Sequence, residues 1–214
     1  MNYHEMENNQ VRLTGTITGK PRFSHEVLGE GFFELSLSVK RLSGQEDIIP
    51  LTVSERLLEN HETQEGQTLC VAGQFRSYNK QENEKSKLML TVFVREILSG
   101  NEEENPNVIK LTGYVCKQPV YRTTPFKREI CDILLAVNRA YNKSDYIPCI
   151  AWGRNARYAA NFRVGEKITV TGRIQSRNYQ KAVGDETVTK TAFEVSVSKI
   201  DKADSVEEYT QSII

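Results

Sequence analysis

Hydrophobic and polar residues alternate along much of this chain with the two-residue period of β-strands. In its second half, segments rich in Ile, Val, Thr and Tyr predict five strands, at about residues 108–115, 128–139, 146–152, 166–179 and 187–200. Between the third and the fourth lies "RNARYAANF", whose three alanines favour one short helix. The first half shows the same order, with "SERLLENH" in the place of the helix and Ser54 available as its N-cap.

Five strands with a helix between the third and the fourth is the element order of the OB-fold, a small Greek-key barrel that often holds oligonucleotides. We therefore predict an all-β protein made of two tandem OB-folds. Each is expected to be a five-stranded Greek-key barrel with one short helix between strands 3 and 4.

The two halves also repeat residue by residue. "VRLTG" at 11–15 matches "IKLTG" at 109–113, and "IP" at 49–50 matches "IP" at 147–148, all at an offset of 98. After one added residue the offset becomes 99, and the matched pairs are Gly66 with Gly165, Gly73 with Gly172, Ser77 with Ser176, and Asn79 with Asn178. A register held over this length indicates an internal duplication.

Between the halves, "SGNEEENP" at 99–106 combines turn-forming residues with like charges and has no apolar periodicity, which predicts a linker. The predicted organisation is an N-terminal OB-fold at 1–98, the acidic linker at 99–106, a C-terminal OB-fold at 107–200 and a short acidic tail at 201–214.

The formal net charge of zero conceals two halves of opposite sign. Residues 1–105 carry 11 Lys and Arg against 17 Asp and Glu, whereas residues 106–214 carry 17 against 11. A basic surface attracts polyanions, so the C-terminal half is the one predicted to bind such a partner. The polar N-terminus and the strand-sized apolar runs predict neither a secretory signal nor a membrane span. The four cysteines have no metal-site spacing, which favours free buried thiols in a cytoplasmic protein.

Aromatic residues gather in "NRAYNKSDYIPCIAWG" at 138–153, which includes Trp152, the chain's only tryptophan. Alternation puts Ile147, Cys149 and Ala151 on one face of this strand, and the other face holds Tyr146, Pro148, Ile150 and Trp152. Small apolar residues suit the crowded interior of a small barrel, so we predict that the rings lie outside. The alternative is a bulge that inverts the alternation and buries Trp152 with Ile150.

The strand at 166–179 divides in the same way. Ile168, Val170 and Ile174 form a core face, and the opposite face holds Thr169, Thr171, Arg173, Gln175, Arg177 and Tyr179. Rings beside guanidinium groups on an open sheet face suit single-stranded nucleic acid, because stacking on a ring contributes ~1–3 kcal/mol per base while Arg and Lys follow the phosphates. A duplex keeps its bases stacked and paired, so such a face favours single strands.

Four stretches of the second half together resemble the bacterial single-stranded DNA-binding protein family: "LTGYVCKQPVYRTTP", "LLAVNRAY", "YIPCIAWGRNA" and "VGEKITVTGRIQSRNYQ". The similarity covers roughly residues 107–200. It implies that the base-stacking positions of the family fall on Tyr141, Tyr146, Trp152 and Tyr179. The cations predicted to contact nucleic acid with them are Arg122, Arg139, Arg173, Arg177 and Lys181. One departure is that Phe126 and Lys127 stand where the family usually has a glycine turn.

The first copy keeps the scaffold pattern but not the aromatic face. The repeat register puts Ser43, Ile48, Ser54 and Lys80 at the four aromatic positions. We predict that this copy is mainly a structural partner. A weak nucleic-acid contact is expected at most from Lys40, Arg41, Arg76 and Tyr78.

The resulting functional prediction is a non-enzymatic single-stranded DNA-binding protein with little sequence preference. It would coat and protect DNA in replication, recombination or repair, alongside proteins of those processes. No cofactor, metal or catalytic residue is predicted, since His4, His25 and His61 have no adjacent nucleophile and Asp132 and Asp145 read as an isolated strand-end acid and a loop acid. Because family members present four OB-folds per assembly, the resemblance implies a homodimer. Two alternatives stay open: a protein adaptor in a replication-restart assembly, and an OB-fold nuclease. A preference for RNA over DNA is equally undecided.

Overall fold

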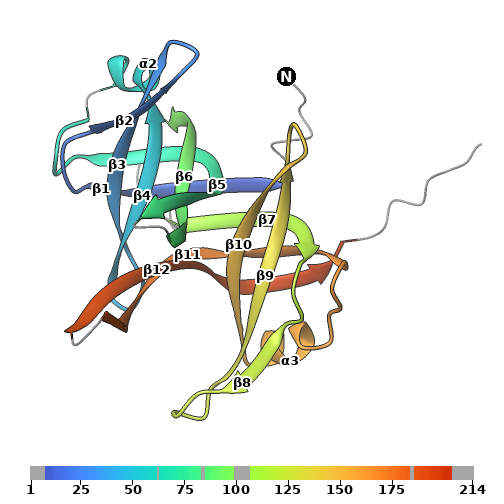
Figure 1. Cartoon of the computed structure of the whole chain (residues 1–214). Helices are drawn as coiled ribbons and strands as arrows, with labels where there is room; N and C mark the ends of the chain where they lie inside the picture. Colours follow the sequence, from blue (N-terminus) through green and yellow to red (C-terminus); the bar gives the residue numbers. More distant parts are fainter. Residues whose placement is uncertain (1–7, 62, 83–84, 99–106, 184–185, 204–214) are drawn as a thin grey trace, which may run out of the picture.

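The computed structural model describes residues 8–61, 63–82, 85–98, 107–183 and 186–203 of the chain. The predicted linker at 99–106 lies outside the described residues, as does the predicted tail except for residues 201–203. Two β-barrels stand side by side, one from each half of the sequence (Figure 1).

The N-terminal barrel consists, in chain order, of β1 (Asn9–Ile17), β2 (Arg22–Val27), β3 (Glu30–Lys40), β4 (Glu46–Ser54), α2 (Glu55–Glu59), β5 (Thr68–Glu82) and β6 (Lys85–Leu98). The C-terminal barrel repeats this order as β7 (Asn107–Val115), β8 (Val120–Thr123), β9 (Glu129–Arg139), β10 (Lys143–Trp152), α3 (Arg154–Ala159), β11 (Lys167–Val183) and β12 (Glu186–Lys202). The prediction of two tandem OB-folds, each with one helix between its third and fourth main strands, is confirmed.

Each barrel has one strand more than predicted. The additional strands, β2 and β8, are fully exposed arms that pair only at one side of β3 and β9. Because neither arm buries a face, neither shows the alternation on which the prediction relied. Ser54 lies at the N-cap of α2 as expected, but its side chain makes no capping hydrogen bond, since its hydroxyl interacts with Glu30 instead.

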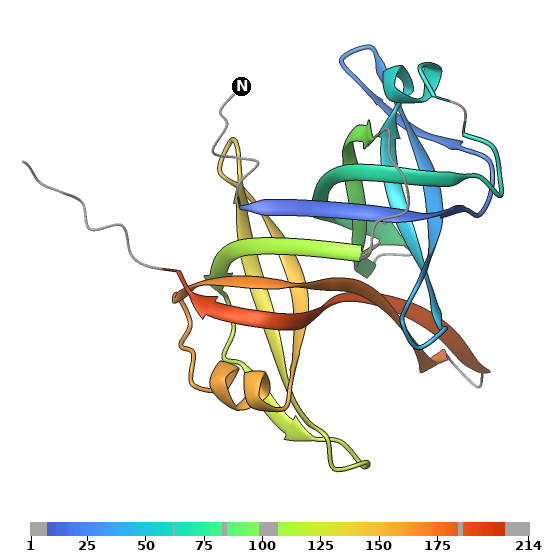
Figure 2. The same cartoon turned by 180° about the vertical axis from the view of Figure 1, so that it is seen from behind.

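The two barrels close in the same way and join edge to edge. In the N-terminal barrel the order is β1-β3-β4-β6-β5 and back to β1, and β7-β9-β10-β12-β11 close the C-terminal barrel. Strands β1 and β7 pair antiparallel, with Val11 opposite Ile109 at the centre of the register. These two residues are equivalent in the internal repeat, so the duplication produces a pair of barrels related by a pseudo-two-fold axis, as the view from behind also shows (Figure 2).

The barrel interiors are filled by the apolar faces that the alternation predicts. Ile147, Cys149 and Ala151 are buried, as are Ile168, Val170 and Ile174. The structure therefore contradicts the alternative in which a bulge inverts β10. All four cysteines are free. In the described ranges, neither helix has the length and apolar character needed to span a membrane.

Two glycines that match in the repeat allow the barrels to close. A Cβ atom on Gly172 would lie 2.1 Å from the carbonyl oxygen of Ser196, and one on Gly73 would lie 2.3 Å from that of Phe93. Both glycines mark a register shift, in the β11–β12 and β5–β6 pairs respectively. The pattern is that of a bulge at a barrel corner, where neighbouring backbone comes too close for any side chain.

Candidate nucleic-acid interface

The outer face of the C-terminal barrel continues across five strands, in the order β8, β9, β10, β12 and β11. On β10, Trp152 pairs with Ile130 of β9, which in turn pairs with Arg122 of β8. Two residues back along β10, Ile150 pairs with Ser196 of β12, which pairs with Arg173 of β11. The hydrogen-bonded register therefore places residues from β8 to β11 on one surface.

Three of the four predicted stacking rings stand along this surface on β10 and the turn before it. Tyr146 is 47% exposed and Tyr141 is 93% exposed, while Trp152 is half-buried. Six residues separate Tyr146 from Trp152, which in an extended strand is about 20 Å. The spacing accommodates several nucleotides between the two rings.

The turn between β9 and β10 holds the most exposed of these rings. Tyr141 and Asn142 both have positive φ, at 59° and 53°, and the Lys143 N–H donates to the Ala140 carbonyl at 3.4 Å. A turn with positive φ at both central residues suits the right-handed twist of the flanking strands but normally uses Asn or Gly. A tyrosine held in this conformation stores backbone strain, which is a feature of functional sites.

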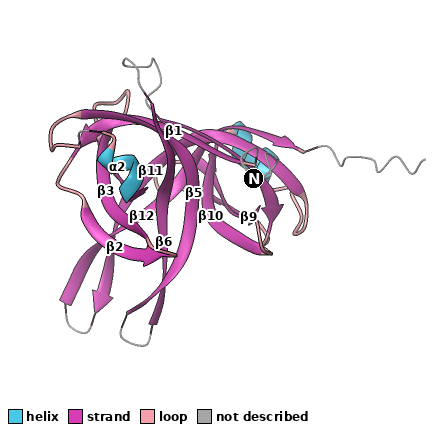
Figure 3. Ribbon diagram, turned by 90° about the horizontal axis from the view of Figure 1, so that it is seen from above, coloured by secondary structure: helices cyan, strands magenta, loops and turns pink. Residues whose placement is uncertain are grey.

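On β11, the predicted contact residues share the outer face. Arg173 and Arg177 are exposed, and Tyr179 is 36% exposed. The side chain of Lys181 lies outside the described part of the structure. Figure 3 shows β11 and β12 from above, where they extend beyond the barrel as a two-stranded ribbon.

Two outer-face side chains that were expected to be exposed are buried. Ile150 is 5% exposed, because β10 has neighbours on both sides at this point, β9 and β12. Gln175 is 7% exposed, and its amide donates to the Glu194 carboxylate at 2.8 Å. Both residues therefore support the face from below and do not form its surface.

Three of the predicted cations are ion-paired. Arg122 contacts Asp132 at 2.8 Å and Arg177 contacts Glu194 at 3.7 Å; both arginines are about half exposed and can exchange these partners for phosphates. Hydrogen bonding to Asp132 raises the pKa of Arg122. Arg139 lies 3.5 Å from Asp145, a carboxylate with no exposed surface. Its first role is therefore to neutralise a buried charge.

Asp132 and Asp145 are not the strand-end and loop acids that the sequence predicted. Asp132 lies within β9, opposite Ile150, and Asp145 lies within β10. Burial raises the pKa of Asp145, against the smaller opposing effects of Ser77 and Arg139. In the described residues, no group of three or more His, Cys, Asp or Glu side chains is arranged to hold a metal ion.

Tyr114 is a further outer-face ring that the sequence reasoning missed. It is 39% exposed on β7 and pairs with Ala136, the residue that Tyr146 faces from the other side. The signal was present in the strand at 107–115, where Tyr114 alternates with the core residues Ile109 and Leu111. The basic Lys110 and Lys167 line a groove of about 620 Å³ beside it.

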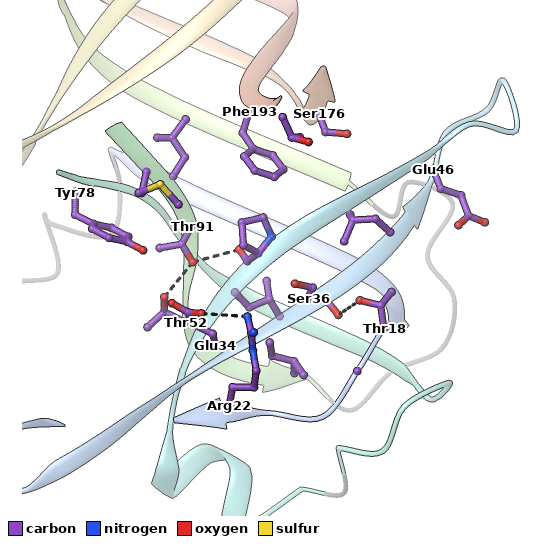
Figure 4. Close-up of a pocket in the computed structure, with 18 of the residues that line it drawn as sticks. Thr18, Arg22, Glu34, Ser36, Glu46, Thr52, Tyr78, Thr91, Ser176 and Phe193 are labelled. Atoms are coloured by element: carbon purple, nitrogen blue, oxygen red, sulfur yellow. Dashed lines mark hydrogen bonds and ion pairs between the residues drawn. The ribbon is translucent and has the colours of Figure 1, made fainter. Parts of the chain in front are cut away.

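The N-terminal barrel has a different outer face. A groove of about 710 Å³ crosses it, lined by residues of β3, β4, β5 and β6 and by the β11–β12 ribbon of the other barrel (Figure 4). Tyr78 and Ile48 are partly exposed there. Arg76 stacks on the ring of Phe93 at 4.0 Å, and Arg41 is held by Asp47. Two of the four weak contacts predicted for this copy are thus engaged within the protein.

Sequence comparison relates this chain to a known protein family. The sequence model of the Single-strand binding protein family matches residues 106–203. Single-stranded DNA-binding protein 1 of Streptococcus pyogenes is 30% identical over 106 residues, which cover 46% of this chain and 82% of that protein. The chain belongs to the single-strand binding protein family. Within this family, Single-stranded DNA-binding protein 2 of Listeria innocua is 38% identical over 85 residues, 36% of this chain and 54% of that protein. The chain thus spans about half the length of this relative and of its counterpart in Bacillus subtilis.

Solved structures extend the likeness to both barrels. The wild-type single-stranded DNA-binding protein of Thermus aquaticus has a TM-score of 0.66 at 24% identity, covering 92% of this chain and 93% of that one. A deletion mutant of the same protein gives 0.69 at 22% identity, covering 92% and 95%. The tandem arrangement of OB-folds is therefore shared with that protein.

Proposed function

We propose that this protein binds single-stranded DNA with little sequence preference, coating and protecting it in replication, recombination or repair. The observation that carries the proposal is the outer face of the C-terminal barrel and its β11–β12 ribbon, where Tyr141, Tyr146, Trp152 and Tyr179 are found together with exposed arginines. Stacking on these rings is available to every base, and the arginines follow the phosphates of a flexible strand. Membership of the single-strand binding protein family supports the same conclusion.

Within this function we assign binding mainly to the C-terminal barrel, at 107–200, and a supporting role to the N-terminal barrel, at 1–98. The residues proposed to contact DNA are the four rings together with Arg122, Arg139, Arg173, Arg177 and Lys181. The exposed positions of Arg122, Arg173 and Arg177 support this assignment. The protein acts without a cofactor, in the cytoplasm, and replication or repair proteins are its expected partners.

A titration with matched oligo-dT, duplex DNA and RNA tests the function. Saturable, salt-sensitive binding of oligo-dT and much weaker binding of duplex are expected, and the RNA arm measures the preference between the two single strands. Loss of DNA in the presence of Mg²⁺ would instead support a nuclease. Absence of any oligonucleotide affinity, together with salt-insensitive binding to a protein, would support the adaptor.

We also propose a homodimer, which gives four OB-folds per assembly. Light scattering coupled to size-exclusion chromatography would then give twice the 24.4 kDa of one chain. A mass of one chain across the micromolar range would contradict the dimer without affecting the binding proposal.

A further inference from the structure

Two polar clamps join the barrels at positions that the internal repeat makes equivalent. In one, which we call the Ser176 clamp, Asp47 and Arg41 of the N-terminal barrel bind Ser176 of β11. In the other, the Ser77 clamp, Asp145 of the C-terminal barrel binds Ser77 of β5. Neither was predicted from the sequence, because each joins residues that are far apart along the chain.

The Ser176 clamp is the more complete of the two. Asp47 is fully buried, and its Oδ1 accepts from the Ser176 N–H at 2.7 Å and from the Ser176 hydroxyl at 2.8 Å. Arg41 donates to the same carboxylate, from Nε at 2.6 Å, and to the Ser176 carbonyl at 3.0 Å. Every polar atom of Ser176 is therefore held by a charged pair of the opposite barrel.

The position of Ser176 gives this clamp its importance. Strand β11 pairs with β7 only from Lys167 to Gly172, and beyond that point it pairs with β12 alone. An isolated two-stranded ribbon is marginally stable. Figure 1 shows the ribbon passing beneath the N-terminal barrel, beside the turn between β3 and β4 that carries Arg41. The clamp thus fixes the ribbon one residue before Arg177 and three before Tyr179.

The Ser77 clamp holds β10, the strand that carries Tyr146 and Trp152. Asp145 Oδ1 accepts from the Ser77 N–H at 2.7 Å, and the Ser77 hydroxyl accepts from the Tyr146 N–H at 2.8 Å. A residue of the N-terminal barrel is thus hydrogen-bonded directly to the backbone of a predicted stacking tyrosine. The two clamps hold different parts of the outer face, one with cations and one with a ring.

From these contacts we propose that the N-terminal barrel positions the single-strand-binding face of its neighbour, with Asp47 and Arg41 aligning Arg177 and Ser77 aligning Tyr146. These are positioning residues, which do not touch the DNA themselves. The proposal rests on the proposed function, and it explains why a copy without its own aromatic face completes the site.

The first test compares Asp47→Asn with Glu30→Gln in the full-length protein. Each variant removes one negative charge from the N-terminal barrel, and Glu30 pairs with Arg56 of α2, at the end of the barrel away from the ribbon (Figure 1). On charge alone, both should bind oligo-dT more tightly. We expect only Asp47→Asn to bind more weakly, and its salt dependence to be shallower by ~0.7 log units per log unit of salt, the value for one lost phosphate contact.

The second test uses Ser77→Ala, which removes the hydroxyl that accepts from the Tyr146 N–H and also contacts Asp145, while the Ser77 N–H stays on Asp145. A less firmly held Tyr146 ring weakens base stacking but does not change the contacts between the arginines and the phosphates. The affinity for oligo-dT should therefore fall about two- to tenfold, the range for one hydrogen bond, with an unchanged salt dependence. The conservative variant Ser77→Thr, which keeps the hydroxyl, should restore the affinity.

Hydrogen exchange in the absence of DNA separates this proposal from the function on which it rests. Amides of residues 173–183 should exchange faster in Asp47→Asn than in the parent or in Glu30→Gln. If the parent binds oligo-dT while Asp47→Asn binds as tightly, with the same salt dependence and the same exchange, the positioning role is overturned. If the parent binds no oligonucleotide, but the amides exchange faster in Asp47→Asn than in the parent, the proposed function is overturned and the clamp is purely structural.

Discussion

Tyr141 offers the most direct test of the stacking face, because its replacement should change binding and stability in opposite directions. The ring is 93% exposed, so it packs against almost nothing in the free protein, and its φ of 59° is costly for any residue with a Cβ atom. Relief of that conformation in Tyr141→Gly contributes roughly 1–2 kcal/mol. The greater freedom of glycine in the unfolded chain offsets roughly 0.5–1 kcal/mol of it. We therefore expect Tyr141→Gly to be more stable than the parent by up to about 1.5 kcal/mol.

The same substitution removes a ring on which a base can stack, which should cost ~1–3 kcal/mol of binding, or about 5- to 160-fold in the dissociation constant for oligo-dT. Tyr141→Ala keeps the backbone strain, so its stability should stay within about 0.5 kcal/mol of the parent while its affinity falls equally. Tyr141→Phe keeps the ring and should bind almost as the parent does.

Fluorescence anisotropy with labelled oligo-dT and urea unfolding on the same preparations measure both quantities. Tyr158→Ala is the matched control, since this tyrosine is 42% exposed on α3, where its ring packs edge-on against Phe162 and lies off the outer face. Unchanged oligo-dT affinity in Tyr141→Gly would refute the stacking role of this ring. A loss of stability in that variant would show that the turn is not strained.

Three further predictions follow from the fold and the site. Trp152 is half-buried on the outer face, so oligo-dT should quench its fluorescence saturably and high salt should reverse the effect; an unresponsive emission in a protein that binds would remove Trp152 from the site. Although burial opposes it, hydrogen bonding from Arg41 and Ser176 lowers the pKa of Asp47. The ionised Asp47 carboxylate therefore stabilises the fold at pH values above its unfolded-state pKa of about 3.9, and this stabilisation is lost as the pH falls through its lower folded-state pKa. Urea unfolding between pH 5 and 2 should show a steep loss of unfolding free energy in the parent that Asp47→Asn lacks. Gly172→Ala puts a Cβ atom 2.1 Å from a backbone oxygen, and calorimetry should show a destabilisation of ~1–3 kcal/mol, whereas an unaffected unfolding temperature would mean that the bulge can widen freely.

Much of the architecture followed from the sequence, because its causes are local. The two-residue alternation of β10 and β11 identified the faces that fill the C-terminal barrel, since side chains on a strand point alternately to opposite sides. The repeat offset paired Gly73 with Gly172, and the structure shows that both permit the same close backbone approach. The positions of the rings at Tyr141, Tyr146 and Trp152 needed only this alternation and the family resemblance.

The remaining features depended on contacts between distant segments, which no local pattern records. Asp145 read as an isolated loop acid, yet it is buried because β5 of the other barrel packs across β10 and brings the Ser77 N–H to its carboxylate. Ile150 obeyed the alternation and is buried nonetheless, because β12 pairs beside it. The pairing of β1 with β7 decides the burial of Asp145: by joining the barrels edge to edge, it brings the copy that lacks the aromatic face against the strands that carry it, and only there can its side chains position the site.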